Sequence, residues 1–326
     1  MPHKTRKELF LLLPAVCGFG LLIINGETAA AAAQAGLESC LHAVIPALFP
    51  FLVLTNLLLR LEIPEAVMRP LGKVFESLFH IRRTALTAFL AGLLGGYPLG
   101  AIAAAECCRL KLCTGEEAER LLVFANNCSP AFLFGIVSVR VSGGKTTALI
   151  LLALQWLISI CIGILLGVGK TASQAGHSES PEVPSFFSRF TLSVRNGCHT
   201  TLLICAYVVF FRVFSSFLPG NALLVGSFEL TSGVLQLPAG PQSIVIAAFL
   251  IGWGGLSVAC QVFSALEGSG LSARRYLPLR LLHGALMAIG AYLLHFSVLY
   301  LLIFALLLLG TVIIVKICGN RAILEI

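Results

Sequence analysis

Two adjacent amide side chains and a hydroxyl group interrupt the apolar stretch 121–139. Asn126 and Asn127 are followed there by Ser129 and Pro130. Buried amides cost free energy unless they are hydrogen-bonded, and amide and hydroxyl groups offer both donors and acceptors to a ligand or an ion. The motif therefore predicts that Asn126, Asn127 and Ser129 bind a substrate. The alternative is that these groups bond to neighbouring helices.

A second interruption lies in the apolar stretch 85–105. Small residues recur there at every fourth position from Ala88 to Ala104, and on a helix they form a stripe that lets another backbone approach closely. Proline removes a backbone donor and frees a carbonyl group, and the freed groups must then face protein, water or ligand. We therefore expect a broken helix at a binding site, with a kinked packing helix as the alternative. The predicted binding residues are Gly95, Gly96, Tyr97, Pro98 and Gly100.

A carboxylate stands in the shorter apolar stretch 222–237. Glu229 is followed there by Thr231 and Ser232. An acidic residue at mid-membrane costs about 2.5–3.5 kcal/mol on insertion scales, so it is normally paired, protonated or functional. We predict an ion-coupling or gating role for Glu229, with Thr231 and Ser232 in substrate binding. A hydrogen-bonded structural glutamate is the alternative.

The apolar stretch 244–265 is interrupted by Trp-Gly-Gly-Leu-Ser. Its predicted substrate-binding residues are Gly254, Gly255, Ser257 and Gln261. Because Gln261 follows Ser257 by four residues, the two side chains are expected on the same helical face.

Other polar residues carry weaker indications. Arg212 lies in an apolar stretch, where it could pair with an anionic substrate, although snorkelling to the nearer interface is favoured. His42, His199 and His283 lack metal-ligand spacing and a carboxylate partner, so we assign them neither a metal nor an acid–base role. Enzyme signatures such as H-E-x-x-H and G-x-S-x-G do not occur. The sequence therefore predicts no enzyme, no metal site and no cofactor.

Composition places the elements that carry these motifs in a membrane. Of the 326 residues, 58% are hydrophobic and 11% are charged, whereas a soluble domain carries about 25% charged residues. The basic residues sit mostly in short clusters between apolar runs, which is typical of a membrane protein and argues against a nucleic-acid partner. The expected partners are the lipid bilayer and a small anionic substrate, and a homo-oligomer is left open.

A helix that crosses the hydrocarbon core needs about 20 mostly apolar residues. Uninterrupted runs of about that length are 9–24, 41–59, 147–168, 200–218, 281–296 and 297–317. Together with the interrupted stretches they predict an all-α, polytopic integral membrane protein with about eight to ten membrane segments, several of them broken or re-entrant. If the basic N-terminus is cytoplasmic, the arginines of 60–83 and the C-terminal Lys316 are cytoplasmic too.

The chain matches itself weakly at a shift of about 160 residues. The segments that begin at Gly36 and Ala88 align with those that begin at Gly197 and Ala248. We therefore predict one membrane domain, 1–326, that comprises repeat 1 at 36–169, a hydrophilic linker at 170–188, repeat 2 at 189–296, and a C-terminal helix and tail at 297–326.

The distribution of positive charge indicates that the two repeats are inverted in the bilayer. The glycine interruptions occupy corresponding places in the two repeats. We therefore expect the segments 95–100 and 254–261 to meet near the bilayer midplane, around a pseudo-twofold axis.

The order of the motifs resembles the YlbJ group of sporulation integral membrane proteins, within the broader nucleoside-recognition Gate-domain proteins. The matching segments are 36–51, 96–100, 116–122, 126–135, 229–233, 254–261 and 280–284. The pairing of Gly-Tyr-Pro-x-Gly with Asn-Asn-x-x-Pro is the more specific part. The resemblance implies a polytopic protein of spore-forming bacteria, distantly similar to concentrative nucleoside transporters. It also implies a role in moving dipicolinic acid from the mother cell across the outer forespore membrane.

The leading hypothesis is a permease for a small organic anion, with dipicolinate as the substrate that the resemblance implies. Two carboxylates on a pyridine ring need donors placed close together, and the N-termini of broken helices, amides and hydroxyl groups can supply them. A transporter of a nucleoside or an ion is one alternative, and a non-transporting membrane scaffold for spore envelope assembly is another. The expected location is the mother-cell or outer forespore membrane.

Overall fold

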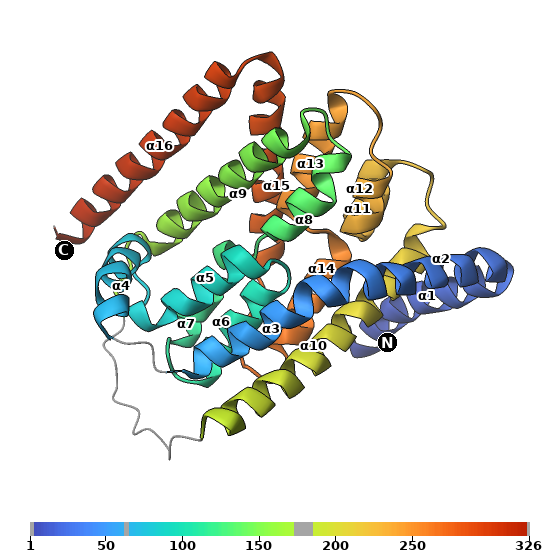
Figure 1. Ribbon diagram of the computed structural model, residues 1–326, viewed down its shortest axis with the longest axis horizontal. Coiled ribbons are helices and arrows are strands. Elements are labelled where there is room, and N and C mark those ends of the chain that lie inside the picture. Colours follow the sequence, from blue (N-terminus) through green and yellow to red (C-terminus); the bar gives the residue numbers. More distant parts are fainter. Residues whose placement is uncertain (1–2, 62–64, 173–184, 325–326) are drawn as a thin grey trace.

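In the computed structural model, every regular element of the described residues is a helix (Figure 1), which confirms the predicted all-α class. The structure describes residues 3–61, 65–172 and 185–324. The α-helices are α1 His3–Ile24, α2 Gly26–Ser39, α3 Ile45–Arg60, α4 Glu65–Phe79, α5 Leu86–Gly95, α6 Leu99–Arg109, α7 Gly115–Ala125, α8 Pro130–Gly135, α9 Gly144–Gly167, α10 Phe186–Ser215, α11 Ala222–Phe228, α12 Leu230–Leu235, α13 Gln242–Trp253, α14 Gly255–Leu266, α15 Tyr276–Phe296 and α16 Val298–Leu324. Short π- or 3-10 helices lie at Cys40–Val44, Arg83–Ala85 and Val137–Val139.

The described residues contain fewer segments of full crossing length than the eight to ten membrane segments, several of them broken or re-entrant, that the sequence predicts. Among the described residues, five segments are long and apolar enough to span a membrane, namely Gly144–Gly167, Phe186–Ser215, Gln242–Leu266, Tyr276–Phe296 and Val298–Gly319. The bent pair Leu12–Ile24 and Gly26–Val44, with an angle of 99°, makes a sixth if it forms one span. Eight to ten segments are not reached because several interrupted runs fold as short helices: α5 has 10 residues and α6 has 11, about half of a full crossing.

The predicted interruptions are true helix ends. The chain leaves helical geometry at 96–98 between α5 and α6, at 126–129 between α7 and α8, and at Gly254 between α13 and α14. The run that contains Glu229 is also divided, into α11 and α12. Pro130 occupies the first position of α8, where its missing N–H leaves no helical hydrogen bond unmade.

The two halves of the chain pack against each other. Helix α10 lies alongside α2 and α3, while α15 packs against α13, α9 and α16 (Figure 1). A cluster of phenylalanines joins α4, α5 and α7, with the rings of Phe79 and Phe124 stacked at 4.7 Å between centroids. Helix α10 begins at Phe186, so the hydrophilic linker ends earlier than the predicted 170–188; residues 173–184 lie outside the described residues.

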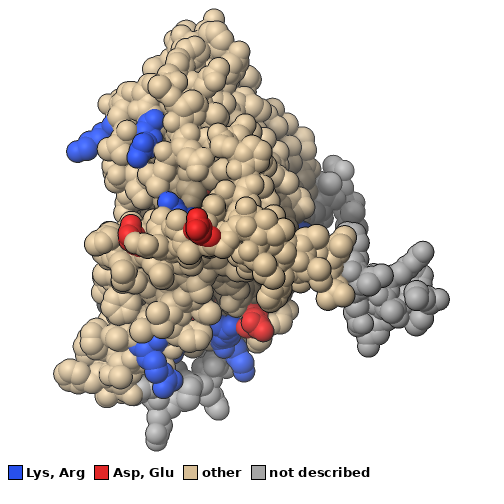
Figure 2. Space-filling model, turned by 90° about the vertical axis from the view of Figure 1, so that its right-hand side faces the viewer, with Lys and Arg blue, Asp and Glu red and all other residues tan. Residues whose placement is uncertain are grey.

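The surface fits a protein surrounded by lipid. Figure 2 shows one face of the molecule, on which most of the surface is uncharged and the charged side chains form a few small groups. Helix α16 exposes large apolar side chains such as Leu306 and Leu307. At its C-terminal part, the Nζ of Lys316 donates hydrogen bonds to the carbonyl oxygens of Ser77 (2.8 Å) and Leu78 (3.3 Å) near the end of α4. This contact puts Lys316 and the end of α4 at the same end of the molecule, as the distribution of positive charge predicts.

Candidate functional site

The break between α5 and α6 fits directly against the break between α7 and α8. Gly96 adopts a left-handed conformation with φ +84°, which lets α5 end abruptly before Tyr97. A Cβ atom on Gly96 would lie 2.7 Å from the backbone nitrogen of Ser129, so only glycine permits this approach. Gly92 and Gly100 lie in the same way against the backbone at Ala125. The small-residue stripe therefore holds two helix ends together.

A second pair of breaks is formed in the other half of the chain. Gly254 and Gly255 have φ values of +87° and +85° and separate α13 from α14. A Cβ atom on Gly255 would lie 3.0 Å from the carbonyl oxygen of Gly226 and 3.3 Å from that of Phe228, at the end of α11. The other break of this pair lies between α11 and α12, where Glu229 ends α11 and caps α12.

Glu229 is the N-cap of α12. Its two carboxylate oxygens accept hydrogen bonds from the backbone N–H groups of Thr231 (2.9 Å) and Ser232 (2.6 Å). A side-chain oxygen acceptor suits this place because the first N–H groups of a helix are otherwise unpaired. Sequence reasoning associated Glu229 with the two hydroxyl groups, whereas the structure shows bonds to the backbone of the same residues. Both oxygens of the carboxylate are hydrogen-bonded within its own segment. This arrangement is the hydrogen-bonded structural glutamate that was the alternative to ion coupling.

Tyr97 connects the two pairs of breaks. Its hydroxyl group donates a hydrogen bond to the carbonyl oxygen of Ile251 (2.8 Å) in the last turn of α13. A Cβ atom on Gly254 would lie 3.4 Å from the Tyr97 ring. The ring of Tyr97 therefore approaches Gly254, as the predicted contact between 95–100 and 254–261 requires, while its hydroxyl group bonds to Ile251 just before that segment.

A cavity of about 300 Å³ lies where these elements meet, and we call it the central cavity. Its lining includes the predicted residues Tyr97, Ser129, Glu229, Thr231, Ser257 and Gln261, together with apolar side chains of α3, α8 and α10. The Nε2 of Gln261 donates to the hydroxyl of Ser257 (3.2 Å), as their spacing predicts. Pro98 and Gln261 line a neighbouring cavity of about 320 Å³.

The remaining predicted residues are not part of the lining of the central cavity. They are Gly95, Gly96, Pro98, Gly100, Asn126, Asn127, Ser232, Gly254 and Gly255. Among them the glycines of the breaks provide close backbone packing, and Ser232 accepts a hydrogen bond from the Nη1 of Arg212 (3.2 Å). Arg212 is half-buried and donates to Ser232, so this contact does not test the snorkelling that the sequence favours.

The two asparagines are fully buried and bond to neighbouring groups. Asn127 donates to the carbonyl oxygen of Phe124 (2.8 Å) and accepts from the hydroxyl of Ser159 on α9 (2.6 Å). Asn126 donates from its Nδ2 to the hydroxyl oxygen of Tyr276 on α15 (2.7 Å). Its Oδ1 has no hydrogen-bond partner among the described residues. The hydrogen bonds to neighbouring helices, which were the alternative to substrate binding, are therefore present. The Oδ1 of Asn126 is the one acceptor of the two amides without a partner among the described residues.

Arg280 on α15 is a functional candidate that sequence reasoning missed. It is fully buried, its Nη2 donates to the hydroxyl of Tyr97, and its guanidinium lies 5.2 Å from the centre of the Tyr97 ring. Its Nη1 lies 2.8 Å from the Nδ1 of His283. Within the described part of the chain, no carboxylate lies within ion-pair distance of Arg280. A buried cation without a counter-charge is expensive, so it is normally functional.

One N–H group of Arg280 and one of the adjacent His283 have no hydrogen-bond partner among the described residues. A guanidinium can only donate, so the Nδ1 of His283 must accept and the proton of the neutral ring is on Nε2. Among the described residues, neither the Nε2 of His283 nor the Nε of Arg280 has a hydrogen-bond partner. Arg280, His283 and the free Oδ1 of Asn126 therefore place unsatisfied polar groups around Tyr97 and Tyr276.

A signal for Arg280 was present in the sequence. The arginine borders the apolar run 281–296 and reads as a flanking charge, but helical spacing puts it on one face with other residues of α15 that the structure buries. These residues are Tyr276, His283, Gly284, Met287 and Ala291. The periodicity of that face indicates that Arg280 points into the protein.

A similarity search adds one relative. The chain is 24% identical over 336 aligned residues to the sporulation integral membrane protein YlbJ of Bacillus subtilis (strain 168), and the alignment covers 88% of this chain and 81% of that protein. No family model and no solved structure matches the chain. The similarity confirms the resemblance to the YlbJ group and supports a membrane role.

Proposed function

We propose that this relative of YlbJ is a membrane permease for a small organic anion, with dipicolinate as the substrate that the family resemblance implies. The observation that carries the proposal is the fully buried Arg280, which has no acidic partner among the described residues. Its own Nε and the Nε2 of the adjacent His283 have no hydrogen-bond partner there. Guanidinium groups bind carboxylates through paired hydrogen bonds, so a dicarboxylate supplies the missing acceptors and the missing negative charge.

The arrangement of the helix breaks supports transport. Irregular backbone at membrane depth is tolerated where it is buried in protein or lines a cavity, and transporters use such breaks at their substrate sites. Here two pairs of breaks, one from each half of the chain, meet at Tyr97. On this proposal the halves 36–169 and 189–296 are inverted repeats of a Gate-like domain, and the protein acts in the outer forespore membrane.

The charge of Arg280 favours an anion over a neutral solute. A nucleoside without phosphate carries no charge that would compensate a buried guanidinium, whereas a carboxylate does. A scaffold without transport activity would need no unpaired cation in its interior. Asn127 and Glu229, whose hydrogen bonds are satisfied within the protein, favour that second candidate, and the experiment below distinguishes the two.

The direct test is uptake of labelled dipicolinate into proteoliposomes that contain only this protein. Arg280→Gln should lower uptake by about 30-fold or more, because loss of a buried charge–charge contact costs about 2 kcal/mol or more. Arg280→Lys should retain part of the activity, since it keeps the charge but not the paired donors. The matched control is Arg195→Gln, which removes an exposed arginine of α10 and should leave uptake unchanged.

Each variant must first be shown to be folded, by a single symmetric peak in gel filtration and by helicity equal to the wild type. Absence of uptake by folded wild-type protein, or equal uptake of dipicolinate and of an uncharged pyridine, would contradict the proposal. Wild-type uptake in a folded Arg280→Gln variant would show that the guanidinium does not bind the anion.

A further inference from the structure

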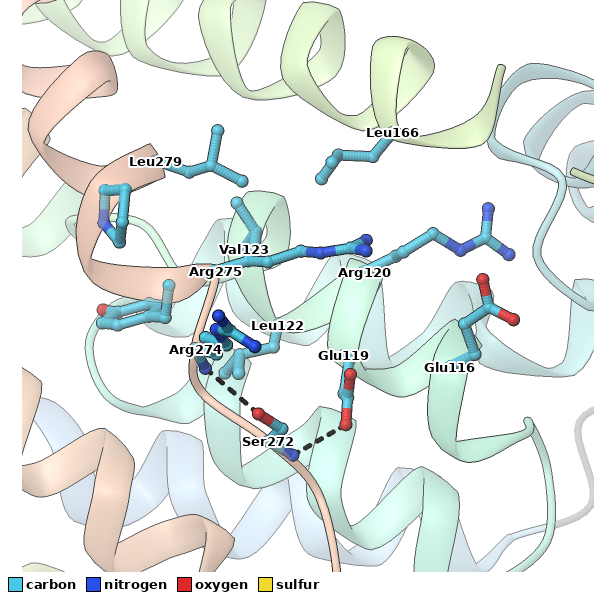
Figure 3. Close-up of a pocket in the computed structure, with 12 residues that line it drawn as sticks. Glu116, Glu119, Arg120, Leu122, Val123, Leu166, Ser272, Arg274, Arg275 and Leu279 are labelled. Atoms are coloured by element: carbon cyan, nitrogen blue, oxygen red, sulfur yellow. Dashed lines mark hydrogen bonds between the residues drawn. The ribbon is translucent and has the colours of Figure 1, made fainter. Parts of the chain in front are cut away.

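A second, larger cavity opens beside α15, and we call it the vestibule. It has a volume of about 680 Å³, within the range of ligand sites, and lies between α7, the end of α9 and the start of α15. Its lining contains three arginines, Arg120, Arg274 and Arg275, and two glutamates, Glu116 and Glu119. Figure 3 shows Arg275 extending over α7 toward Arg120, while Glu119 turns toward the loop that precedes α15.

The acidic side chains of the vestibule are engaged elsewhere. Glu116 forms an ion pair with Lys170 (2.7 Å), and the Lys170 ammonium lowers the pKa of Glu116 from its usual value. Glu119 accepts a hydrogen bond from the backbone N–H of Ser272 (2.7 Å). The side chains of Arg274 and Arg275, by contrast, have no hydrogen-bond or ion-pair partner among the described residues. With Lys170 counted, the positive groups outnumber the negative ones by four to two.

Arg120 adds a buried positive charge to the lining of the vestibule. It is 4% exposed, and its Nη1 and Nη2 donate to the carbonyl oxygens of Phe79 (3.1 Å) and His80 (2.7 Å). Its Nε has no partner among the described residues. Arg275 is the N-cap of α15, so the positive end of the dipole of this 21-residue helix adds to the positive potential.

Tyr276 connects the vestibule to the surroundings of Arg280. Tyr276 lines the vestibule, and its hydroxyl accepts the hydrogen bond of Asn126. Arg280 follows Tyr276 by one helical turn and holds the hydroxyl of Tyr97, which in turn lines the central cavity. A series of contacts therefore leads from the vestibule through Tyr276 and Arg280 to Tyr97 and the central cavity. Arg280 lines neither cavity, and each cavity has one of the two tyrosines in its lining.

We propose that the vestibule is a second anion-binding site, where Arg274 and Arg275 bind a small soluble dicarboxylate before it reaches Arg280. This inference rests on the permease function proposed above. The contact of Arg120 with the end of α4 puts the vestibule at the same end as Lys316, which the distribution of positive charge makes cytoplasmic. The site captures the anion from the cytoplasmic side, and movement of Tyr276 and Asn126 gives it access to Arg280.

The test compares a vestibule variant with a control variant. It measures the dependence of uptake on dipicolinate concentration and on ionic strength. The double variant Arg274→Gln/Arg275→Gln should raise the KM for dipicolinate added at the vestibule side by about 10-fold with Vmax unchanged, since exposed charges increase capture. Its uptake should also lose most of the inhibition by ionic strength that the wild type shows below about 0.15 M salt. The matched control, Arg140→Gln/Arg195→Gln, removes two exposed arginines outside the vestibule and should keep the wild-type KM and salt dependence.

A binding measurement separates this site from the transport site. Purified Arg280→Gln in neutral detergent should still bind labelled dipicolinate, with a stoichiometry about one lower than the wild type, and the further change Arg274→Gln/Arg275→Gln should remove the remaining binding. Loss of all binding in Arg280→Gln alone would overturn the second site, as would a wild-type KM in the vestibule variant. Absence of wild-type uptake would overturn the permease function, while the binding measurement would still decide on the vestibule.

A lipid headgroup shares the anionic chemistry of a dicarboxylate and must be distinguished from it. The KM difference between the vestibule variant and the wild type should be the same in vesicles of pure phosphatidylcholine and in vesicles that also contain phosphatidylglycerol. A difference seen only with phosphatidylglycerol would show that the vestibule binds lipid and would overturn the proposal.

Discussion

Tyr97→Phe removes one oxygen atom at the point where the two halves of the protein meet. The hydroxyl group makes two hydrogen bonds, as donor to the carbonyl oxygen of Ile251 and as acceptor from Arg280. The ring and its contact with the guanidinium, at 5.2 Å, remain in the variant. The substitution therefore tests the hydrogen bonds of Tyr97 and leaves its packing in place.

The expected cost follows from the two bonds. An interhelical hydrogen bond in a membrane protein contributes about 0.6 kcal/mol on average. A hydrogen bond from a charged donor contributes about 1.5–3 kcal/mol, and its loss is not offset by water at a fully buried site. We therefore expect the free energy of unfolding to fall by about 2–3.5 kcal/mol.

The assay is reversible unfolding by sodium dodecyl sulfate in mild detergent, followed by circular dichroism. Tyr292→Phe is the matched control, because that tyrosine lies on α15 with 54% of its surface exposed and should change the unfolding free energy by less than about 0.5 kcal/mol. A double-mutant cycle of Tyr97→Phe with Arg280→Gln should give a coupling energy of about 1.5 kcal/mol or more. A coupling within about 0.5 kcal/mol of zero would refute the direct contact between Tyr97 and Arg280.

Three further predictions concern the helix breaks. If Glu229 couples ion binding to transport, Glu229→Gln should abolish the dependence of uptake on an imposed proton or cation gradient while the protein stays folded, whereas unchanged gradient dependence would show that the carboxylate only caps α12, the role that its two backbone hydrogen bonds support. Asn127→Ala should destabilise the fold by about 1–3 kcal/mol because it leaves buried groups unpaired. Asn126→Ala should mainly reduce uptake, because the Oδ1 of Asn126 is free for a ligand. Equal amounts of the two variants in the membrane, with equal uptake, would contradict this difference. Gly96→Ala should prevent accumulation of folded protein, since its φ is +84° and its neighbour is backbone, whereas Gly135→Ala meets no atom and should accumulate normally in the same membrane blot.

Local chemistry made the helix breaks predictable from the sequence. Proline cannot donate a backbone hydrogen bond and glycine adopts left-handed conformations readily, so Pro98, Pro130 and Gly254 indicated helix ends. Proline alone is not sufficient, because Pro14, Pro50 and Pro70 lie inside helices. The all-α class followed from the long apolar runs in the same way. The number of crossings did not, because the length of an apolar run does not reveal whether two half-helices continue in one direction or turn back.

Partnerships between distant residues were the part that the sequence did not reveal. Asn126 and Asn127 were correctly marked as buried amides, but their bonds to Tyr276 and Ser159 depend on how α15 and α9 pack against α7. Arg280 was read as a flanking charge because a run of apolar residues follows it directly. The periodicity of α15 indicates that this arginine is on the buried face, and the packing of α15 against the breaks shows which residues it contacts.

The position of Arg280 links the stability of the fold to its proposed activity. In the observed state the guanidinium is held by the Tyr97 hydroxyl and by His283, and these neutral partners leave its charge uncompensated. On the permease proposal, an anion that pairs with both the free Nε and the Nη2 of Arg280 would share Nη2 with the hydroxyl that joins Tyr97 to α13 at Ile251. Binding in this way would weaken the contact between the two pairs of helix breaks when the charge is neutralised. Arg280, the proposed anion-binding residue, is thus hydrogen-bonded to Tyr97, which joins the two halves of the chain. This hydrogen bond is the physical basis that we propose for coupling anion binding to a change in access.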